Sequence, residues 1–271
     1  MSNKNMDNTR KKVVAVIQVR MGSTRLLQKV LLDISGKTAI EWIKYRLSFC
    51  KEIDKVVVST SDSAENDPIE EITKDLDLEF YRGSEHDLVD RMYQTAKKFS
   101  ADAIVRVTAD CPLVDPSIVD GLVKKYRENP NDVDHVTNIF PPTYPDGMDV
   151  EVMPFRILEK LNQEVKDKLY REWLTITIME NPDNFDIINV PLDKNLSYLR
   201  LTVDYQEDLD LVTKIFEKIH KEGKVFGLND ILDLLRKEPE LIEINKNRVD
   251  QGILNSIRSA EFHNLKKQNK K

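Results

Sequence analysis

A short basic loop follows the first apolar run of the chain, and its residue types suit phosphate binding. Residues 18–29 read QVRMGSTRLLQK and hold three cations, Arg20, Arg25 and Lys29, around the single glycine Gly22. Arginine forks match non-bridging phosphate oxygens, and a lysine supplies a movable point charge. The loop lacks the second glycine of a Walker A loop and the GxGxxG spacing of a dinucleotide fingerprint. On spacing alone it is either a phosphate loop or a solvated basic turn.

Two aspartates follow later apolar runs and have the chemistry of magnesium ligands. Asp110 comes after the run 103–108, and Asp204 comes after the run 199–203. Ligands of an open parallel sheet bind outside the carboxyl ends of its strands, and Mg²⁺ takes one or two carboxylates besides phosphate oxygens and water. The alternatives are a turn former before proline for Asp110 and a helix N-cap for Asp204. Asp149, in PDGMDVE, is either a ligand of a sugar hydroxyl or an exposed strand acid.

The elements that must position these residues alternate between strand and helix over residues 12–138. Apolar β-branched runs predict buried strands at residues 13–19, 55–60, 78–81, 103–108 and 134–137. Apolar residues at helical spacing predict helices at residues 38–49, 66–75, 86–99 and from 115 to about 128. This alternation implies right-handed crossovers. The predicted fold is α/β, a doubly wound, mostly parallel sheet with helices on both faces.

The pattern changes after residue 138. Residues 140–147 are rich in turn formers, and the alternating stretch 148–153 follows them. We then expect a helix over residues 170–180, strands over 186–190 and 199–203, and helices over 205–222 and 228–236. These features predict one domain over residues 12–238 with an excursion at about 140–190. They also predict a disordered tail over residues 1–11 and a helical, basic-ended extension over 239–271.

Composition excludes several classes of protein. The chain has 271 residues, 40% of them hydrophobic, and only two cysteines, which rules out a disulfide scaffold and a zinc site with four cysteines. No apolar run approaches the length of a membrane span. Residues 1–12 carry a charge of +3 and residues 264–271 carry +4. Because the net charge of the whole chain is −6, the region between them carries −13. We therefore expect a cytoplasmic, soluble protein that does not insert into membranes and binds no nucleic acid.

Five segments together resemble the SpsF-like cytidylyltransferases, relatives of the CMP-sialic acid (acylneuraminate) and CMP-Kdo synthetases. They occur in the order of that family over residues 12–220: IQVRMGSTRL at 17–26, YRGSE at 81–85, RVTADCPLVD at 106–115, GMDVE at 147–151 and LTVD at 201–204.

The resemblance implies a three-layer α/β/α, GT-A-like nucleotidyltransferase fold and transfer of CMP from CTP to an acidic sugar or small phosphorylated acceptor, with release of pyrophosphate. It implies a role in surface polysaccharide or glycoconjugate precursor synthesis, and a homodimer formed through the excursion. The implied ligands of Mg²⁺ are Asp110 and Asp204. The implied catalytic residues are Arg25, Lys29, Asp110 and Asp204. The implied nucleotide contacts are Gln18, Arg20, Met21, Gly22, Ser23, Arg25, Lys29, Arg82, Ser84 and Asp110. The implied acceptor contacts are Asp149, Glu151 and Arg171.

Two motifs depart from the family pattern. The family loop usually continues Leu-Pro-Gly-Lys, whereas this chain has Leu27 and Gln28 before Lys29. The family often has Arg-Glu-His where this chain has Arg171, Glu172 and Trp173. Two other functions remain open at this point. One is a glycosyltransferase that uses nucleotide sugars, which shares the fold class, and the other is a family member that binds nucleotide without turnover.

Overall fold

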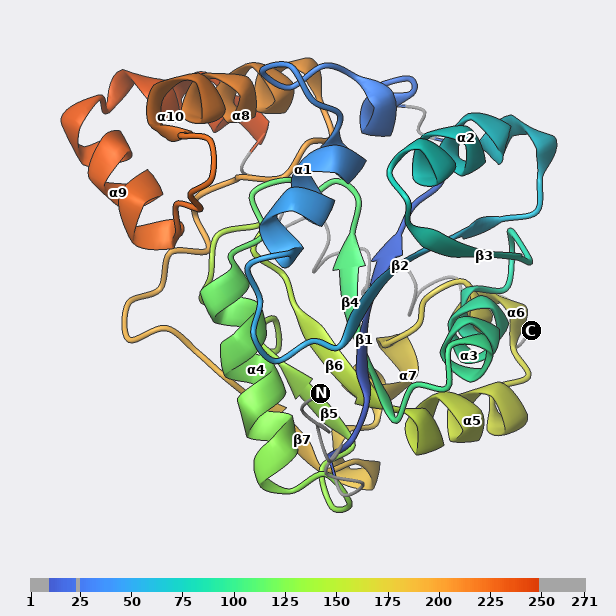
Figure 1. Cartoon of the computed structure of the whole chain (residues 1–271). Helices are drawn as coiled ribbons and strands as arrows, with labels where there is room; N and C mark the ends of the chain where they lie inside the picture. The colour runs from blue at the N-terminus through green and yellow to red at the C-terminus, as the bar shows by residue number, and fades with distance from the viewer. Residues whose placement is uncertain (1–9, 23–24, 249–271) are drawn as a thin grey trace, which may run out of the picture.

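A mixed sheet forms the centre of the molecule (Figure 1). The computed structural model describes residues 10–22 and 25–248, and within them the strand order is β3-β2-β1-β4-β6-β5-β7. The strands are β1 (Val13–Gln18), β2 (Lys55–Ser61), β3 (Glu79–Gly83), β4 (Ala103–Thr108), β5 (His135–Thr137), β6 (Glu151–Pro154) and β7 (Ile187–Asn189). Strands β3, β2, β1 and β4 are mutually parallel, and β7 is parallel to β5. Strand β6 is antiparallel to both of its neighbours. The mostly parallel sheet is confirmed.

Helices cover both faces of the sheet, so the three-layer architecture is also confirmed. One layer holds α1 (Ala39–Leu47), α2 (Asp67–Asp75), α4 (Pro116–Glu128), α8 (Gln206–Ile219) and α9 (Leu228–Lys237). The other layer holds α3 (Leu88–Lys98), α5 (Phe155–Glu164), α6 (Lys168–Arg171) and α7 (Ile176–Glu180). Each layer has its own apolar cluster, because alternate residues of β1 and β4 point to opposite faces of the sheet. Within the described residues, no helix is both long enough and apolar enough to cross a membrane.

Local capping explains where several helices begin. Thr38 caps α1, and its hydroxyl accepts from the backbone of Glu41 while the Glu41 carboxylate accepts from the backbone of Thr38. Asp115 caps α4, whose first residue is Pro116. Asp87 caps α3 through the backbone N–H of Asp90. These starts follow the carboxyl ends of the sheet, so they fix the loops that bear the candidate residues.

Three predictions about the second half of the chain were wrong. Residues 199–203 do not join the sheet as a strand; they run extended, and their one bridge pairs Arg200 with Asp146. The expected helix 170–180 is two short helices, α6 and α7, separated by four residues. Helix α5 was missed, although Ile157, Leu158 and Leu161 have helical spacing and are buried.

The segment after α9 packs against the rest of the described chain. It contains α10 (Glu240–Glu243) and the 3₁₀ turn η4 (Lys246–Arg248), and Leu241 is buried in the same apolar cluster as α8 and α9. Figure 1 shows α10 beside α8 and α9. The remaining short 3₁₀ turns are η1 (Lys29–Leu31), η2 (Ala64–Asn66) and η3 (Pro182–Asn184). Residues 1–9 and 249–271, which hold most of the two predicted tails, lie outside the described residues.

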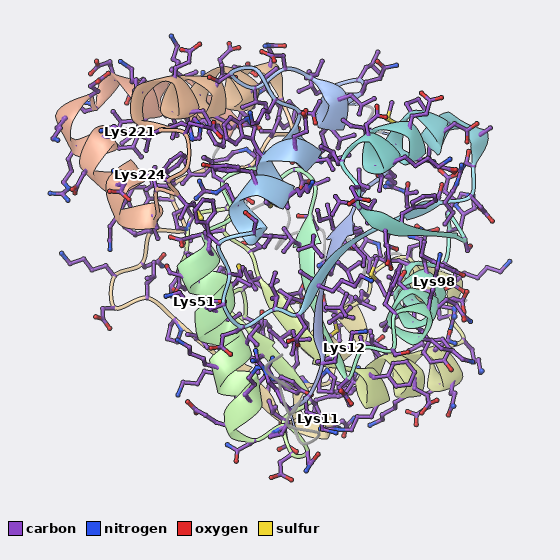
Figure 2. All side chains as sticks on the ribbon, viewed as in Figure 1. Lys11, Lys12, Lys51, Lys98, Lys221 and Lys224 are labelled. Carbon is purple, nitrogen blue, oxygen red and sulfur yellow. The ribbon has the colours of Figure 1, made fainter. Side chains whose placement is uncertain are left out.

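Charged side chains project from many parts of the outline of the molecule (Figure 2). The labelled lysines come from separate places along the chain. Lys12 lies beside the start of β1, Lys98 lies at the end of α3, and Lys221 and Lys224 lie between α8 and α9.

Candidate active site

Two aspartates from distant parts of the chain meet on one lysine at the carboxyl end of the central strands. Lys29, the first residue of η1, places its Nζ 3.0 Å from Asp110 Oδ2 and 2.6 Å from Asp204 Oδ1. Asp110 lies in the turn that directly follows β4. The backbone N–H of Val203 donates to the Asp110 carbonyl at 2.8 Å, which holds the Asp204 segment against this turn. The structure therefore brings together three of the predicted catalytic residues.

Their proximity shifts the pKa values of Asp110 and Lys29. Burial alone would raise the pKa of Asp110, but the Lys29 ammonium and a hydrogen bond from Thr108 hold it well below its usual value. Burial alone would lower the pKa of Lys29, but the two carboxylates outweigh it and raise it. Lys29 and Asp110 are therefore both ionised near neutral pH.

An arginine that the sequence analysis did not single out holds the other side of Asp204. Arg200 is almost fully buried and donates to Asp204 Oδ2 at 2.9 Å, to Asp208 Oδ1 at 3.0 Å and to Asp146 Oδ2 at 2.5 Å. These carboxylates raise the pKa of Arg200 in spite of its burial. Arg200 and Asp208 stand four residues before and after Asp204. Asp208 lies in the first turn of α8, whose N-cap is Tyr205, and Arg200 lies before that helix, so no local sequence pattern indicates that the two side chains meet.

A tight turn brings Asp146 to the same cluster. Gly147 has φ +101°, and a Cβ there would lie 2.5 Å from the backbone carbon of Leu201. Only glycine fits this approach without strain. The backbone of Asp146 donates to the Leu199 carbonyl at 3.0 Å and accepts from Leu201 at 2.6 Å. Burial, opposed by Arg200 and reinforced by three nearby aspartates, raises the pKa of Asp146 to about 6.

The loop after β1 is anchored by an asparagine side chain. The backbone N–H of Met21 donates to Asn66 Oδ1 at 2.8 Å, and Asn66 is fully buried. Gly22 is exposed, and a Cβ there would lie 3.2 Å from Glu65 Oε1. The loop therefore lies against η2. Ser23, a predicted nucleotide contact, lies outside the described residues.

Two arginines beside this loop lack carboxylate partners among the described residues. Arg20 is exposed at the end of β1 and forms no hydrogen bond or ion pair there. Arg91 of α3 is buried, donates only to the carbonyls of Ser84 and Glu85, and leaves its Nε without a partner. Burial and the positive charge of Arg20 lower the pKa of Arg91 to about 10. Arg91 is a cation near the loop that sequence reasoning missed.

The departure from Leu-Pro-Gly-Lys preserves the backbone shape that a glycine would favour. Gln28 has φ 53° and ψ 26°, the left-handed region that is strained for a residue with a side chain. This conformation still directs Lys29 to the two aspartates. Arg25 reaches Asp204 Oδ1 at 2.9 Å and lies over the ring of Tyr205 at 5.4 Å. Leu27, where the family has proline, is 75% exposed.

Arg82 and Ser84 make contacts within the fold and do not join the acidic cluster. The Arg82 guanidinium donates to the carboxylates of Asp67 and Glu70, at 2.8 and 2.7 Å, and to the carbonyls of Ser61 and Ser63. Arg82 thus braces the loop that carries Asn66. The Ser84 Oγ accepts from the backbone N–H of Asp87 at 3.2 Å.

A row of polar side chains crosses the sheet beside the cluster. Gln18 of β1 accepts from Arg106 of β4 at 2.7 Å, Arg106 pairs with Glu151 of β6, and His135 Nε2 of β5 lies 3.1 Å from Glu151 Oε2. Burial alone would raise the pKa of Glu151, but Arg106 and His135 lower it to about 2. Asp149 is different, because burial and the charges of Asp146, Glu151 and Asp110 raise its pKa well above the usual value.

Arg171 also lies apart from the cluster. Its guanidinium donates to Asp87 Oδ2 at 2.6 Å, to Asn162 Oδ1 at 2.6 Å and to the carbonyls of Asn162 and Val165. These bonds tie α6 to α5 and to the start of α3. Trp173, where the family often has histidine, is 49% exposed.

The residues at the cluster fit a magnesium ion that is shared with a phosphate ligand. Among the described residues no group of three acids, histidines or cysteines could hold a metal by itself. Asp110 and Asp204 nevertheless converge on a single positive charge, the Lys29 ammonium. Mg²⁺ needs only one or two protein carboxylates when phosphates and water complete its shell. The two carboxylates therefore fit a magnesium ion whose other ligands are phosphate oxygens and water.

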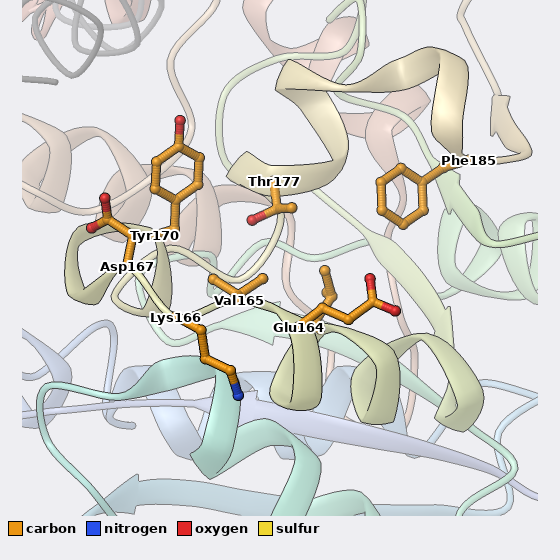
Figure 3. A pocket seen from close by; sticks show the side chains of 8 residues that line it. Glu164, Val165, Lys166, Asp167, Tyr170, Thr177 and Phe185 are labelled. Carbon is orange, nitrogen blue, oxygen red and sulfur yellow. The ribbon is translucent and has the colours of Figure 1, made fainter. Parts of the chain in front are cut away.

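A cavity of ≈ 290 Å³ lies elsewhere, between α5, α6 and α7 (Figure 3). It is lined by Leu161, Glu164, Val165, Lys166, Asp167, Tyr170, Thr177 and Phe185. None of the predicted site residues lines it. The convergence of charges, rather than this cavity, identifies the candidate site.

Solved structures with this architecture include nucleotidyltransferases. The structure of a CMP:2-keto-3-deoxy-manno-octonic acid synthetase complexed with CTP matches with a TM-score of 0.60, covering 76% of this chain and 99% of that chain at 20% identity. This likeness shows the fold. A structure of a cytidylyltransferase from Leptospira borgpetersenii matches with a TM-score of 0.82, covering 86% of this chain and 97% of that chain at 34% identity. The fold is that of a nucleotidyltransferase.

The family model described as cytidylyltransferase matches residues 14–248, and the chain belongs to that family of CTP-dependent nucleotidyltransferases. Two curated relatives align with this chain over almost the whole of their own length. An uncharacterized protein of Methanocaldococcus jannaschii is 34% identical over 87% of this chain and 95% of its own. The spore coat polysaccharide biosynthesis protein SpsF of Bacillus subtilis is 26% identical over 84% of this chain and 95% of its own. The resemblance seen in the five sequence motifs is confirmed.

Proposed function

We propose that this cytidylyltransferase transfers CMP from magnesium-bound CTP to a small anionic acceptor, an acidic sugar or a phosphorylated compound, and releases pyrophosphate. The carrying observation is the convergence of Asp110 and Asp204 on Lys29, beside the basic loop after β1. The likeness to SpsF supports a role in surface polysaccharide or glycoconjugate precursor synthesis. We further propose that the enzyme acts in the cytoplasm as a homodimer.

The charges of the site suit phosphoryl transfer. Asp110 and Asp204 would hold Mg²⁺, which supplies charge stabilisation to the triphosphate and the leaving pyrophosphate. Arg20, with Arg25 and Lys29, would bind the phosphate oxygens; Arg20 has no other partner within the described residues. An acceptor oxygen attacks the α-phosphorus in line, and positioning and electrostatics carry most of the rate enhancement. An acceptor phosphate is already ionised near neutral pH and needs no general base, whereas an acceptor sugar hydroxyl would lose its proton to solvent as its oxygen bonds to phosphorus and pyrophosphate leaves.

The acceptor would bind next to the Asp146–Glu151 segment. Asp149 supports this because its raised pKa leaves it protonated over a wider range, so that it can donate a hydrogen bond to a sugar hydroxyl. Glu151 stays ionised and holds Arg106, so the acceptor meets a fixed polar row. The guanidinium group of Arg171 already donates hydrogen bonds to Asp87, Asn162 and Val165. Its role in acceptor binding is therefore indirect, through the placement of α6.

The test is pyrophosphate release with Mg²⁺, each of the four nucleoside triphosphates and a panel of acidic sugars and phosphorylated acceptors. We expect release with CTP only. Asp110→Asn and Asp204→Asn should each lower it by about 100-fold or more, because a bound metal contributes several kcal/mol of charge stabilisation. The matched control is Asp183→Asn, an exposed aspartate of η3. Equal activity of all the variants, or turnover of a nucleotide sugar in place of CTP, would contradict the proposal.

A further inference from the structure

The segment after α9 reaches the candidate site through one asparagine. Asn245 lies between α10 and η4 and is 3% exposed. Its Nδ2 donates to the carbonyl of Arg200 at 3.0 Å and to Asp208 Oδ1 at 2.9 Å. Both partners belong to the network that surrounds Asp204. Asn245 is thus joined by buried hydrogen bonds to residues 45 and 37 positions earlier in the chain.

Asp208 in turn fixes the backbone that carries Asp204. Its Oδ2 accepts from the backbone N–H groups of Asp204 and Tyr205, both at 3.1 Å, and it pairs with Arg200. Asp208 is fully buried. A carboxylate in this position has no solvent to replace a lost partner, so its orientation depends on the donors around it.

Arg200 transmits the same constraint to the side chain of Asp204. Its NH2 group donates to Asp204 Oδ2 at 2.9 Å, which leaves Oδ1 directed at Lys29 and Arg25. Since Asn245 holds both the carbonyl of Arg200 and the carboxylate of Asp208, it constrains both supports of Asp204.

A second set of contacts anchors the same segment. The Arg248 guanidinium lies 4.2 Å from the centroid of the Tyr205 ring and pairs with Glu207 at 3.1 Å. The end of the described chain is thereby fastened to the first turn of α8, immediately after Asp204.

We propose that Asn245 is a positioning residue for the metal-binding carboxylate Asp204, and that residues 245–248 act as a brace that completes the active site. The inference rests on the proposed function, in which Asp204 is a ligand of Mg²⁺. Partners that orient a metal ligand without touching the metal change metal affinity by about 10–100-fold when removed. Asn245 does not contact Asp204 itself but acts through Arg200 and Asp208, so we expect its removal to weaken metal binding by about tenfold.

The experiment measures binding of Mn²⁺, as a spectroscopic substitute for Mg²⁺, to the full chain with CTP, by electron paramagnetic resonance. Asn245→Leu keeps the size of the side chain and removes its donor. The expected result is metal binding weaker by about tenfold, with a higher half-saturating Mg²⁺ concentration in turnover and a kcat close to wild type at saturating metal. Asn245→Ala, which also lacks the donor, serves the same purpose if the leucine variant does not fold.

The matched control is Leu241→Ala, which removes apolar packing of α10, the helix before the brace, without touching the network. It should lower stability but leave Mn²⁺ affinity within about threefold of wild type, since no hydrogen bond around Asp204 is lost. Unchanged metal affinity in both Asn245 variants would overturn the proposed positioning role of Asn245. An equal loss of metal affinity in Leu241→Ala would overturn it as well. Failure of the wild type itself to bind Mn²⁺ with CTP would instead overturn the proposed metal site.

Discussion

Replacing Lys29 with methionine tests the central cluster directly. In the structure the Lys29 ammonium is shared by Asp110 and Asp204, and the lysine side chain is 11% exposed. Methionine has a similar length and no charge. Asp204 keeps Arg200 and Arg25, but Asp110 loses its only basic partner among the described residues.

The expected cost follows from the two lost bonds. A hydrogen bond to a charged group contributes about 1.5–3 kcal/mol, and burying a methionine side chain costs about as much conformational entropy as burying a lysine side chain. The variant should therefore unfold with a free energy lower by about 3–6 kcal/mol. In the variant Mg²⁺ can enter between the carboxylates without displacing an ammonium. At a concentration tenfold above its dissociation constant, it would restore about 1.4 kcal/mol.

Urea unfolding, with and without Mg²⁺, measures both effects. We expect Lys29→Met to be the less stable protein without metal and to gain more from Mg²⁺ than the wild type gains. Lys218→Met is the control, because Lys218 pairs with Glu238 at the surface, and it should alter neither quantity. The reasoning is refuted if Lys29→Met is as stable as the wild type, or if Mg²⁺ stabilises both proteins equally.

Three further predictions concern single residues. Glu151→Gln should be less stable than wild type at neutral pH. Because the pKa of Glu151 is about 2 in the folded state and near 4.5 in the unfolded state, the difference in stability should shrink as pH falls through that interval. Urea unfolding from pH 7 to pH 3 measures this difference. Gly147→Ala should cost about 1–3 kcal/mol, since its φ is +101° and the new Cβ meets Leu201, and thermal unfolding measures it. Gln28→Gly should raise the unfolding free energy by about 1 kcal/mol because it relieves a left-handed residue.

Each of these has its own check. Gly121→Ala, in α4 with nothing within 4 Å of the new Cβ, should stabilise by about 0.5–1 kcal/mol and so contrasts with Gly147→Ala. A constant difference between Glu151→Gln and wild type down to pH 3 would contradict the assigned pKa. A destabilised Gln28→Gly variant would mean that Gln28 makes contacts which outweigh its backbone strain.

The sequence by itself determined the first half of the fold and the location of the candidate residues along the chain. The runs that became β1, β2 and β4 are apolar on both faces, and a strand of that composition is stable only inside a parallel sheet covered by helices. Because the carboxyl ends of parallel strands share one edge, the loop after β1 and Asp110 had to meet there. The five motifs identified the family because they occur together, in the order of that family.

Only the tertiary structure decided which charges are paired. The family resemblance implied that Arg82 and Arg171 contact the ligands. In the structure both guanidinium groups donate to carbonyls and carboxylates of the fold. It expected a strand over residues 199–203, since Leu199, Leu201 and Val203 alternate; the turn at Gly147 instead holds that segment outside the sheet.

A hydrogen-bond network spans residues 146–245 and joins Asp146, Arg200, Asp208 and Asn245. No local sequence pattern predicts this network. The physical reason is one of range. Side-chain periodicity reports which face of an element is buried, and it carries no information about the partner that a buried charge meets. That partner is set when distant segments pack, since a buried charge requires a paired and hydrogen-bonded environment.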